Sequence, residues 1–224
     1  MARLAVFDMN ETTLDLAPVR AEINRQLGHS GAAGMWFSRL LGLSMAITAT
    51  GDYKPFTQLA RTAMGSVADS VAGFDAISDE NWQRVVDAIL TLPPHPDVAN
   101  GLVSLIADGW RLFALTNSTQ AAVEAQLASG NIADLFEAVV SVEAVQTFKP
   151  SPAPYHHIAA VAGVEPSDMW MVAAHDWDLA GAKAVGMRTA FISRPGARFL
   201  DVFPAADVTA ADFTDLAVKL ADVA

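Results

Sequence analysis

The chain lacks cysteine altogether. This absence excludes disulfide bonds, thiol nucleophiles and cysteine-ligated metal sites, although it does not fix the redox compartment. The chain also lacks a basic tract: its 14 Lys and Arg residues are outnumbered by 25 Asp and Glu residues, which gives a formal net charge of -11 at pH 7. This balance argues against nucleic acid as a partner, and an anionic substrate would need local positive groups.

Long hydrophobic runs are also missing, since no apolar stretch approaches the length that spans a membrane and no signal-peptide pattern precedes the first apolar run. We therefore expect a cytoplasmic protein without a membrane partner. Hydrophobic residues make up 52% of the chain and charged residues 17%, a composition typical of a globular enzyme. A length of 224 residues allows one sizeable core, or a core with a smaller inserted domain.

Strand and helix patterns divide the chain into two kinds of segment. The run Leu4-Ala5-Val6-Phe7 predicts a buried parallel strand that ends at Asp8. Residues 17–92 show helical spacing, with breaks predicted at Gly51-Asp52 and between Gly65 and Gly73. From Pro96 onward the patterns alternate: strands are predicted at 111–115, 138–142, 169–174 and 189–192, and helices at 97–107, 119–129, 152–162, 178–185 and 211–223.

This alternation predicts βαβ units and therefore an α/β fold with a doubly wound parallel sheet. The helical stretch interrupts the sheet domain after its first strand, and the cluster Pro93-Pro94-His95-Pro96 marks the return. We expect a core domain of residues 1–15 and 93–224, and an inserted helical cap domain of residues 16–92.

Polar side chains follow several of the predicted strands. They are Asp8 and Asn10, Thr116-Asn117-Ser118, Lys149 in the loop Phe148-Lys149-Pro150, and His175-Asp176-Trp177-Asp178. Because the carboxyl ends of parallel strands meet at one edge of a sheet, these groups would converge there. Each alone has a plain structural explanation as a helix cap, a turn residue or a surface residue. Four such clusters at successive strand ends favour a functional site.

Four short motifs carry a resemblance to a known family. They are Phe7-Asp8-x-Asn10-x-Thr12, Leu115-Thr116-Asn117, Lys149-Pro150 and Asp178-x-x-Gly181-Ala182. In this order they resemble the four motifs of the haloacid dehalogenase superfamily, over essentially the whole chain. Phe148-Lys149-Pro150 followed by Tyr155, and the run Val172 to Asp178, look most like the type II (L-2-haloacid) dehalogenases. The resemblance implies a Rossmann-like core with a helical cap inserted after the first motif.

Most members of that superfamily are magnesium-dependent phosphatases, and a small-molecule phosphatase is therefore the main alternative. The family's usual general acid, two positions after the nucleophile, is replaced here by Asn10, which cannot supply a proton. The usual metal-binding Asp of the fourth motif aligns with Ala174, and Asp176 could substitute for it only if the loop shifts. Halide leaves as a stable anion without a proton or a metal. The resemblance thus implies a dehalogenase that needs no metal or other cofactor.

By resemblance, Asp8 would attack C2 of a short 2-haloalkanoic acid, expel halide and form an ester that water hydrolyses to a 2-hydroxy acid. Lys149 would keep Asp8 ionised, and Thr12 would steady its loop. Water would be activated near Asp178, with His175 as a candidate base or orienting group. The candidate substrate-binding residues are Met9, Asn10, Thr116 (for the substrate carboxylate), Asn117 (toward the halide), Tyr155 (beside Lys149), Phe37, Trp177 and Arg39.

Two positions depart from the family pattern. The family's halide-binding arginine directly follows a tryptophan in the cap, but here Phe37 follows Trp36 and Arg39 stands two residues further on. Two residues rotate a helix by about 200°, so Arg39 is either a halide ligand or a solvated or salt-bridging arginine. The second departure is His175 in place of Asn; it could add a base or narrow the halide pocket, and a narrower pocket could admit fluoride.

Two further alternatives remain open. One is a non-enzymatic binding or assembly module that has inherited the site, although the retention of Asp8, Lys149 and Asp178 argues against it. The other concerns assembly: the apolar stripe between Met35 and Ile47 fits a homodimer interface through the cap, and it fits burial within the cap equally well.

Overall fold

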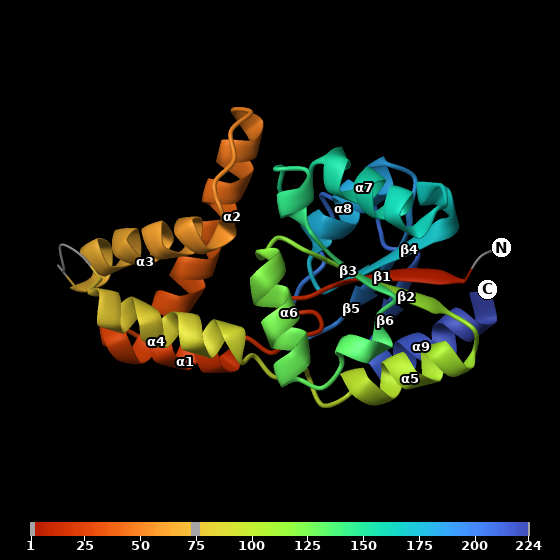
Figure 1. The fold of residues 1–224 in the computed structure, drawn as a ribbon, viewed down its shortest axis with the longest axis horizontal. Helices are drawn as coiled ribbons and strands as arrows, with labels where there is room; N and C mark the ends of the chain where they lie inside the picture. Colours follow the sequence, from red (N-terminus) through yellow and green to blue (C-terminus); the bar gives the residue numbers. More distant parts are fainter. Residues whose placement is uncertain (1–2, 73–76, 224) are drawn as a thin grey trace.

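A six-stranded parallel sheet forms the centre of the molecule. The computed structural model describes residues 3–72 and 77–223. The strands follow the order β3-β2-β1-β4-β5-β6, and each neighbouring pair is parallel (Figure 1). Their bounds are β1 (Leu4–Asp8), β2 (Arg111–Thr116), β3 (Ala138–Ser141), β4 (Met169–Ala173), β5 (Arg188–Ile192) and β6 (Val208–Ala210). Because β1 lies between β2 and β4, its carboxyl end is flanked by the ends of both neighbours.

Helices cover both faces of this sheet, which explains why β1 is a continuous apolar run. Ala5 and Phe7 pack into one hydrophobic cluster with helices α5 (Val98–Ala107), α6 (Gln120–Ser129) and α9 (Phe213–Val223). Leu4 and Val6 point to the opposite face and pack with α7 (Pro152–Ala162) and α8 (Asp176–Ala184). The predicted doubly wound parallel sheet is therefore confirmed.

Helices α1 (Ala17–Leu27), α2 (Ala32–Ala49), α3 (Phe56–Ala72) and α4 (Asp79–Leu90) lie together beside the sheet (Figure 1). The Nε1–H of Trp36 donates to the Ala60 carbonyl at 2.9 Å and so joins α2 to α3. Gln126 Nε2 donates to the Ile89 carbonyl at 2.9 Å and joins α6 to α4. No helix within the described residues is both long and apolar enough to cross a membrane.

Several element boundaries differ from the prediction. The break expected between Gly65 and Gly73 is wrong at Gly65, because α3 continues through it, packed against α2; Gly73 lies outside the described residues. Helix α8 begins at Asp176, two residues earlier than predicted. The short strand β6 and the 3-10 helices Ala133–Leu135, Val142–Ala144 and Pro166–Asp168 were not predicted, since three residues are too few to show a period.

Candidate active site

The carboxyl group of Asp8 stands at the carboxyl end of β1, and the residue is only 5% exposed. Its Oδ1 accepts a hydrogen bond from Lys149 Nζ at 2.7 Å. Its Oδ2 accepts one from Thr12 Oγ1, also at 2.7 Å. Thr13 Oγ1 donates to the Asp8 carbonyl at 2.7 Å and closes the turn that follows the strand. The carboxylate is thus held on both oxygens by groups that the sequence places at two separate strand ends.

Lys149 is fully enclosed, and its ammonium group has three acceptors. They are Asp8 Oδ1 and Asp178 Oδ2, each at 2.7 Å, and the Leu115 carbonyl at 3.1 Å. The Lys149 backbone N–H donates to Asn117 Oδ1 at 3.0 Å. Asn117, predicted to lie toward the halide, therefore uses its side-chain oxygen to fix the loop that carries the lysine.

Burial and charge together decide which groups at this site are ionised. Burial alone would raise the pKa of Asp8, but the charge of Lys149 and the contact with His175 outweigh it and hold that pKa well below its ordinary value. Burial would lower the pKa of Lys149, but the charges of Asp178 and Asp8 raise it above 10.5. Burial, with the nearby charge of Asp8, raises the pKa of Asp178 above 3.8 despite the attraction of Lys149. Asp8 is therefore the stronger acid of the two.

Asp178 has both side-chain oxygens occupied. Besides the contact to Lys149, its Oδ1 accepts a hydrogen bond from the Tyr155 hydroxyl at 2.6 Å. Burial, reinforced by Asp178, raises the pKa of Tyr155 well above 10.0, so the hydroxyl keeps its proton and donates. Asp178 is 0% exposed. This geometry suits Asp178 to holding Lys149 in place, as Tyr155 does for Asp178.

The remaining polar groups tie the strand ends to one another. Thr12 Oγ1 accepts from the Ala174 backbone N–H at 2.9 Å, so its own hydrogen is directed to Asp8. Thr116 Oγ1 accepts from the Ser118 N–H at 3.1 Å. Asn10 Nδ2 donates to Ser118 Oγ at 3.0 Å. The structure therefore brings the predicted residues of the first, second and fourth motifs to a single edge.

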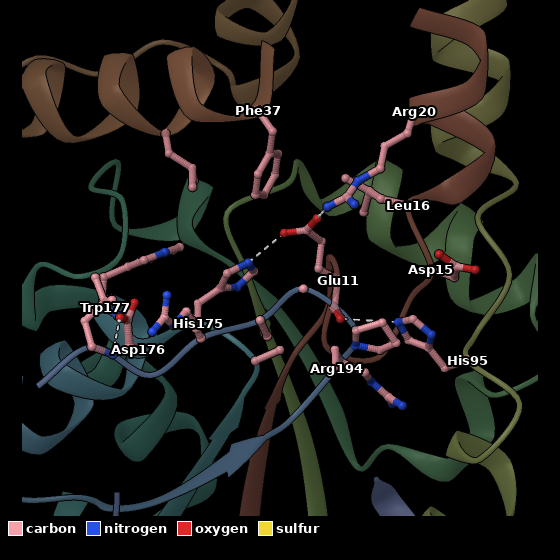
Figure 2. Close-up of a pocket in the computed structure, with 17 residues that line it drawn as sticks. Glu11, Asp15, Leu16, Arg20, Phe37, His95, His175, Asp176, Trp177 and Arg194 are labelled. Atoms are coloured by element: carbon pink, nitrogen blue, oxygen red, sulfur yellow. Dashed lines mark hydrogen bonds and ion pairs between the residues drawn. The ribbon is translucent and has the colours of Figure 1, made fainter. Parts of the chain in front are cut away.

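His175 lies between two carboxylates. Its Nδ1 is 3.2 Å from Asp8 Oδ2, and its Nε2 is 2.9 Å from Glu11 Oε2. The imidazole ring stacks on Trp177, with centroids 5.3 Å apart, and packs against Phe37 at 5.9 Å. Figure 2 shows the Glu11 carboxylate reaching His175 on one side and the guanidinium of Arg20 on the other. Glu11 and Arg20 are not among the predicted site residues, because their pairing depends on how helix α1 packs against the turn after β1.

Two cavities adjoin this cluster. The larger has a volume of about 660 Å³ and is lined by Glu11, Arg20, Phe37, His175 and Trp177, among others (Figure 2). The smaller, about 30 Å³, lies between the sheet edge and helices α2 and α3, and its lining includes Asn10, Phe37 and Ser118. Phe37 of α2 lines both cavities, and it therefore lies between the larger one and the smaller one.

Of the predicted site residues, only Asn10, Phe37, His175 and Trp177 line at least one of the two cavities. Met9 is fully buried and lines neither of them. Arg39 is exposed on α2, lines neither cavity, and its side chain has no hydrogen-bond or ion-pair partner within the described residues. The structure thus brings Phe37, and not Arg39, to the site.

The donor set does not fit a divalent cation. Within residues 3–72 and 77–223, no group of three or more His, Asp or Glu side chains is arranged to hold a metal. The two carboxylates that a phosphatase of this pattern would use, Asp8 and Asp178, are bridged by the Lys149 ammonium at 2.7 Å from each. The amide of Asn10 is turned toward Ser118. A magnesium ion would have to compete with the Lys149 ammonium for the carboxylate oxygens of Asp8 and Asp178.

The family model of the haloacid dehalogenase-like hydrolases matches residues 2–186. The chain belongs to this family. Among its relatives, (S)-2-haloacid dehalogenase 1 of Pseudomonas sp. (strain CBS-3) is 28% identical over 194 residues, which cover 86% of this chain and 85% of that protein. The (S)-2-haloacid dehalogenase of Xanthobacter autotrophicus is 28% identical over 197 residues, covering 87% of this chain and 76% of that protein.

The fold of this hydrolase is also that of solved structures. The structure of L-2-haloacid dehalogenase from Xanthobacter autotrophicus with chloropropionic acid covalently bound superposes with a TM-score of 0.92. Its sequence identity is 23%, and the superposition covers 100% of both chains. At that identity the likeness establishes the fold alone, and it confirms the predicted Rossmann-like architecture. The predicted resemblance to the superfamily is confirmed by the family model.

Proposed function

We propose that this hydrolase converts short 2-haloalkanoic acids to 2-hydroxy acids by hydrolytic dehalogenation, through an ester on Asp8. The observation that carries the proposal is the buried Asp8 carboxylate, held by Lys149 at 2.7 Å and by Thr12 at 2.7 Å. Relatives named (S)-2-haloacid dehalogenase, and a solved relative that holds chloropropionic acid covalently, support the same chemistry.

The first step uses the carboxylate as a nucleophile toward carbon. Because the pKa of Asp8 is well below its ordinary value, its carboxylate is ionised at neutral pH. One carboxylate oxygen attacks C2, the new C–O bond forms, and halide leaves with the electron pair of the C–X bond. The leaving halide needs no proton, which suits a site whose position 10 is an asparagine.

Substrate binding must overcome the acidic character of the chain. The Thr116 hydroxyl oxygen accepts from the Ser118 N–H, and its own hydrogen has no acceptor within the described residues, so it can donate to the substrate carboxylate. Backbone N–H groups of the turn after β1 would complete a site that binds an anion without a net positive charge. Trp177 lines the larger cavity and would border this site, whereas Met9 and Tyr155 are fully buried and line neither cavity, so they would act only by supporting the residues around them.

The second step is hydrolysis of the ester at its carbonyl carbon. Asp178 has both oxygens occupied by Lys149 and Tyr155, and we assign it to positioning the lysine. His175 contacts Asp8 and lines the larger cavity, and these two contacts support our assignment of His175 as the base that accepts a proton from water.

We also propose that helices α1 to α4 act as the cap, with the domain division at residues 16–92. Phe37 of α2 lines both cavities, and Arg20 of α1 pairs with Glu11, which supports a site shared between the two parts. Met35 is exposed on α2, where the homodimer interface is predicted. The homodimer and the cytoplasmic location both stay predictions.

An oxygen-labelling experiment tests the proposed reaction. The protein turns over L-2-chloropropionate repeatedly in H₂¹⁸O with a chelator present. The mass of the peptide that contains Asp8 is then measured by mass spectrometry. Ester hydrolysis at the acyl carbon puts solvent oxygen into the Asp8 carboxylate, whereas direct attack of water on C2 labels only the product. Phosphate release that rises with magnesium, without any release of chloride, would instead support the phosphatase. Parallel assays with bromoacetate and fluoroacetate measure the halogen preference.

A further inference from the structure

Glu11 occupies an unusual backbone position. It lies in the turn after β1 with φ at 64°, in the left-handed region that non-glycine residues rarely adopt. The turn is fixed by a hydrogen bond from the Glu11 N–H to the Leu14 carbonyl at 2.9 Å. A residue with a long charged side chain is therefore held where glycine would be unstrained, and such strain is commonly found at functional sites.

The Glu11 side chain connects two parts of the protein. Its Oε2 lies 2.9 Å from His175 Nε2, and its carboxylate forms an ion pair with Arg20 of α1 (Figure 2). Half of the Arg20 side chain is exposed, and exposed ion pairs contribute little to stability. A purely structural role therefore accounts poorly for a strained glutamate, and its contact with His175 needs another explanation.

The two ring nitrogens of His175 have different hydrogen-bond partners and therefore different chemical roles. An ionised carboxylate can only accept hydrogen bonds, so the contact with Glu11 requires a hydrogen on Nε2. The contact with Asp8 at 3.2 Å then leaves Nδ1 as the nitrogen whose proton can be exchanged. Trp177 and Phe37 pack on the ring and restrict its rotation.

We propose that Glu11, held by Arg20, is a positioning residue that keeps a proton on Nε2 of His175 and makes Nδ1 the base for hydrolysis of the Asp8 ester. This inference rests on the dehalogenation proposed above and deepens it. The arrangement follows the general logic by which a carboxylate fixes the tautomer of a catalytic histidine.

The proton balance of the cycle is closed. Esterification removes the charge of Asp8, and Nδ1 of His175 is then the nitrogen that can accept a proton from water. Water adds to the ester carbonyl carbon and gives a proton to Nδ1. The bond between that carbon and the substrate oxygen breaks, and the substrate oxygen takes the proton from Nδ1 to become the hydroxyl. The acid proton of Asp8 passes through Nδ1 to the solvent in the larger cavity that His175 lines, which restores the carboxylate.

The test separates the two chemical steps. L-2-chloropropionate is mixed with the wild type and with four variants: Glu11→Gln, Glu11→Gly, Arg20→Gln and Glu22→Gln. Glu22 is the matched control, because its side chain is about as buried as that of Glu11. Samples are quenched in acid, and the mass of the intact protein is measured by mass spectrometry. We expect Glu11→Gln and Glu11→Gly to slow ester hydrolysis on the order of 10²-fold, to change ester formation little, and to accumulate the adduct. Arg20→Gln should act in the same direction but more weakly, and Glu22→Gln should behave as wild type.

Two comparisons exclude a merely structural role. Glu11→Gly relieves the left-handed strain, so it should unfold no more easily than wild type while still accumulating ester. In a His175→Gln background, Glu11→Gln should cause no further slowing, because it acts through the histidine. Unchanged ester hydrolysis in both Glu11 variants, or an equal further loss in the double variant, would overturn the inference alone. Absence of chloride release and of any adduct in wild type would overturn the proposed function as well.

Discussion

The ammonium nitrogen of Lys149 lies 2.7 Å from Oδ1 of Asp8, although 141 positions separate the two residues in the chain. The same nitrogen is 2.7 Å from Asp178 Oδ2, and all three side chains are almost completely buried. Buried charges are stable only when they are paired. Lys149 therefore stabilises the folded sheet edge, and it also keeps the carboxylate of the proposed nucleophile, Asp8, ionised.

Replacement of Lys149 by methionine would leave two buried carboxyl groups without their cation. We expect Lys149→Met to lower the free energy of unfolding by about 3–5 kcal/mol, as measured by urea denaturation at pH 7. Lys54→Met is the matched control, since Lys54 pairs with Asp52 at an exposed site and its loss should change nothing measurable. A variant at position 149 as stable as the control would show that the buried pairs contribute nothing.

The Tyr155 hydroxyl gives a sharper test of the same network. Tyr155→Phe leaves Oδ1 of Asp178 without its 2.6 Å donor in a dry site, at a cost of about 1–3 kcal/mol in unfolding free energy. The contrasting variant is Tyr53→Phe, because the Tyr53 hydroxyl is buried without a hydrogen-bond partner within the described residues. Its removal should be neutral or stabilising. Equal effects of the two substitutions would contradict this interpretation of the hydrogen bonds.

Two glycine-to-alanine substitutions should have opposite effects. A Cβ at Gly181 would lie 2.6 Å from the Pro150 carbonyl oxygen and 2.7 Å from the Tyr155 hydroxyl, so Gly181→Ala must displace the loop that carries Lys149. We expect reduced halide release together with a lower melting temperature. A Cβ at Gly65, inside α3, meets nothing within 4 Å. Gly65→Ala should stabilise the protein by about 0.5–1 kcal/mol, and a loss of stability there would count against the observed course of α3.

The Asp97–Arg194 pair predicts a dependence of stability on pH. Burial raises the pKa of Asp97, but hydrogen bonds from Arg194 and the Phe213 N–H outweigh it and lower that pKa below 3.8. A lowered folded-state pKa contributes stability above pH 3.8 that is lost as the pH falls through the lowered value. Asp97→Asn should therefore cost about 1–3 kcal/mol at pH 7 and progressively less below pH 3.8. A difference that grows in acid would have the wrong sign.

Local patterns were sufficient for most of the fold. The strands that were predicted are short apolar runs bounded by polar turns, and the helices show their spacing over several turns, so neighbours along the chain encode both. Asp8 at the end of the first run is a local feature of this kind. The errors lie where tertiary contacts override local preference. Gly65 predicts a break between helices, yet α3 continues through this residue and packs against α2. Strand β6 is too short to show any pattern.

The sequence alone determined the type of the longer elements, the motif residues at the strand ends and the absence of thiol chemistry, because these depend on residues close together in the chain. Only the tertiary structure decided which of those residues touch. The order β3-β2-β1-β4 brings Lys149, in the loop after β3, between the carboxylate at the end of β1 and the one that follows β4. The turn after β1 places Glu11 against His175, 164 positions away. The position of α2 decides that Phe37 faces the cavities while Arg39 faces solvent, because a rotation of about 200° separates them on one helix.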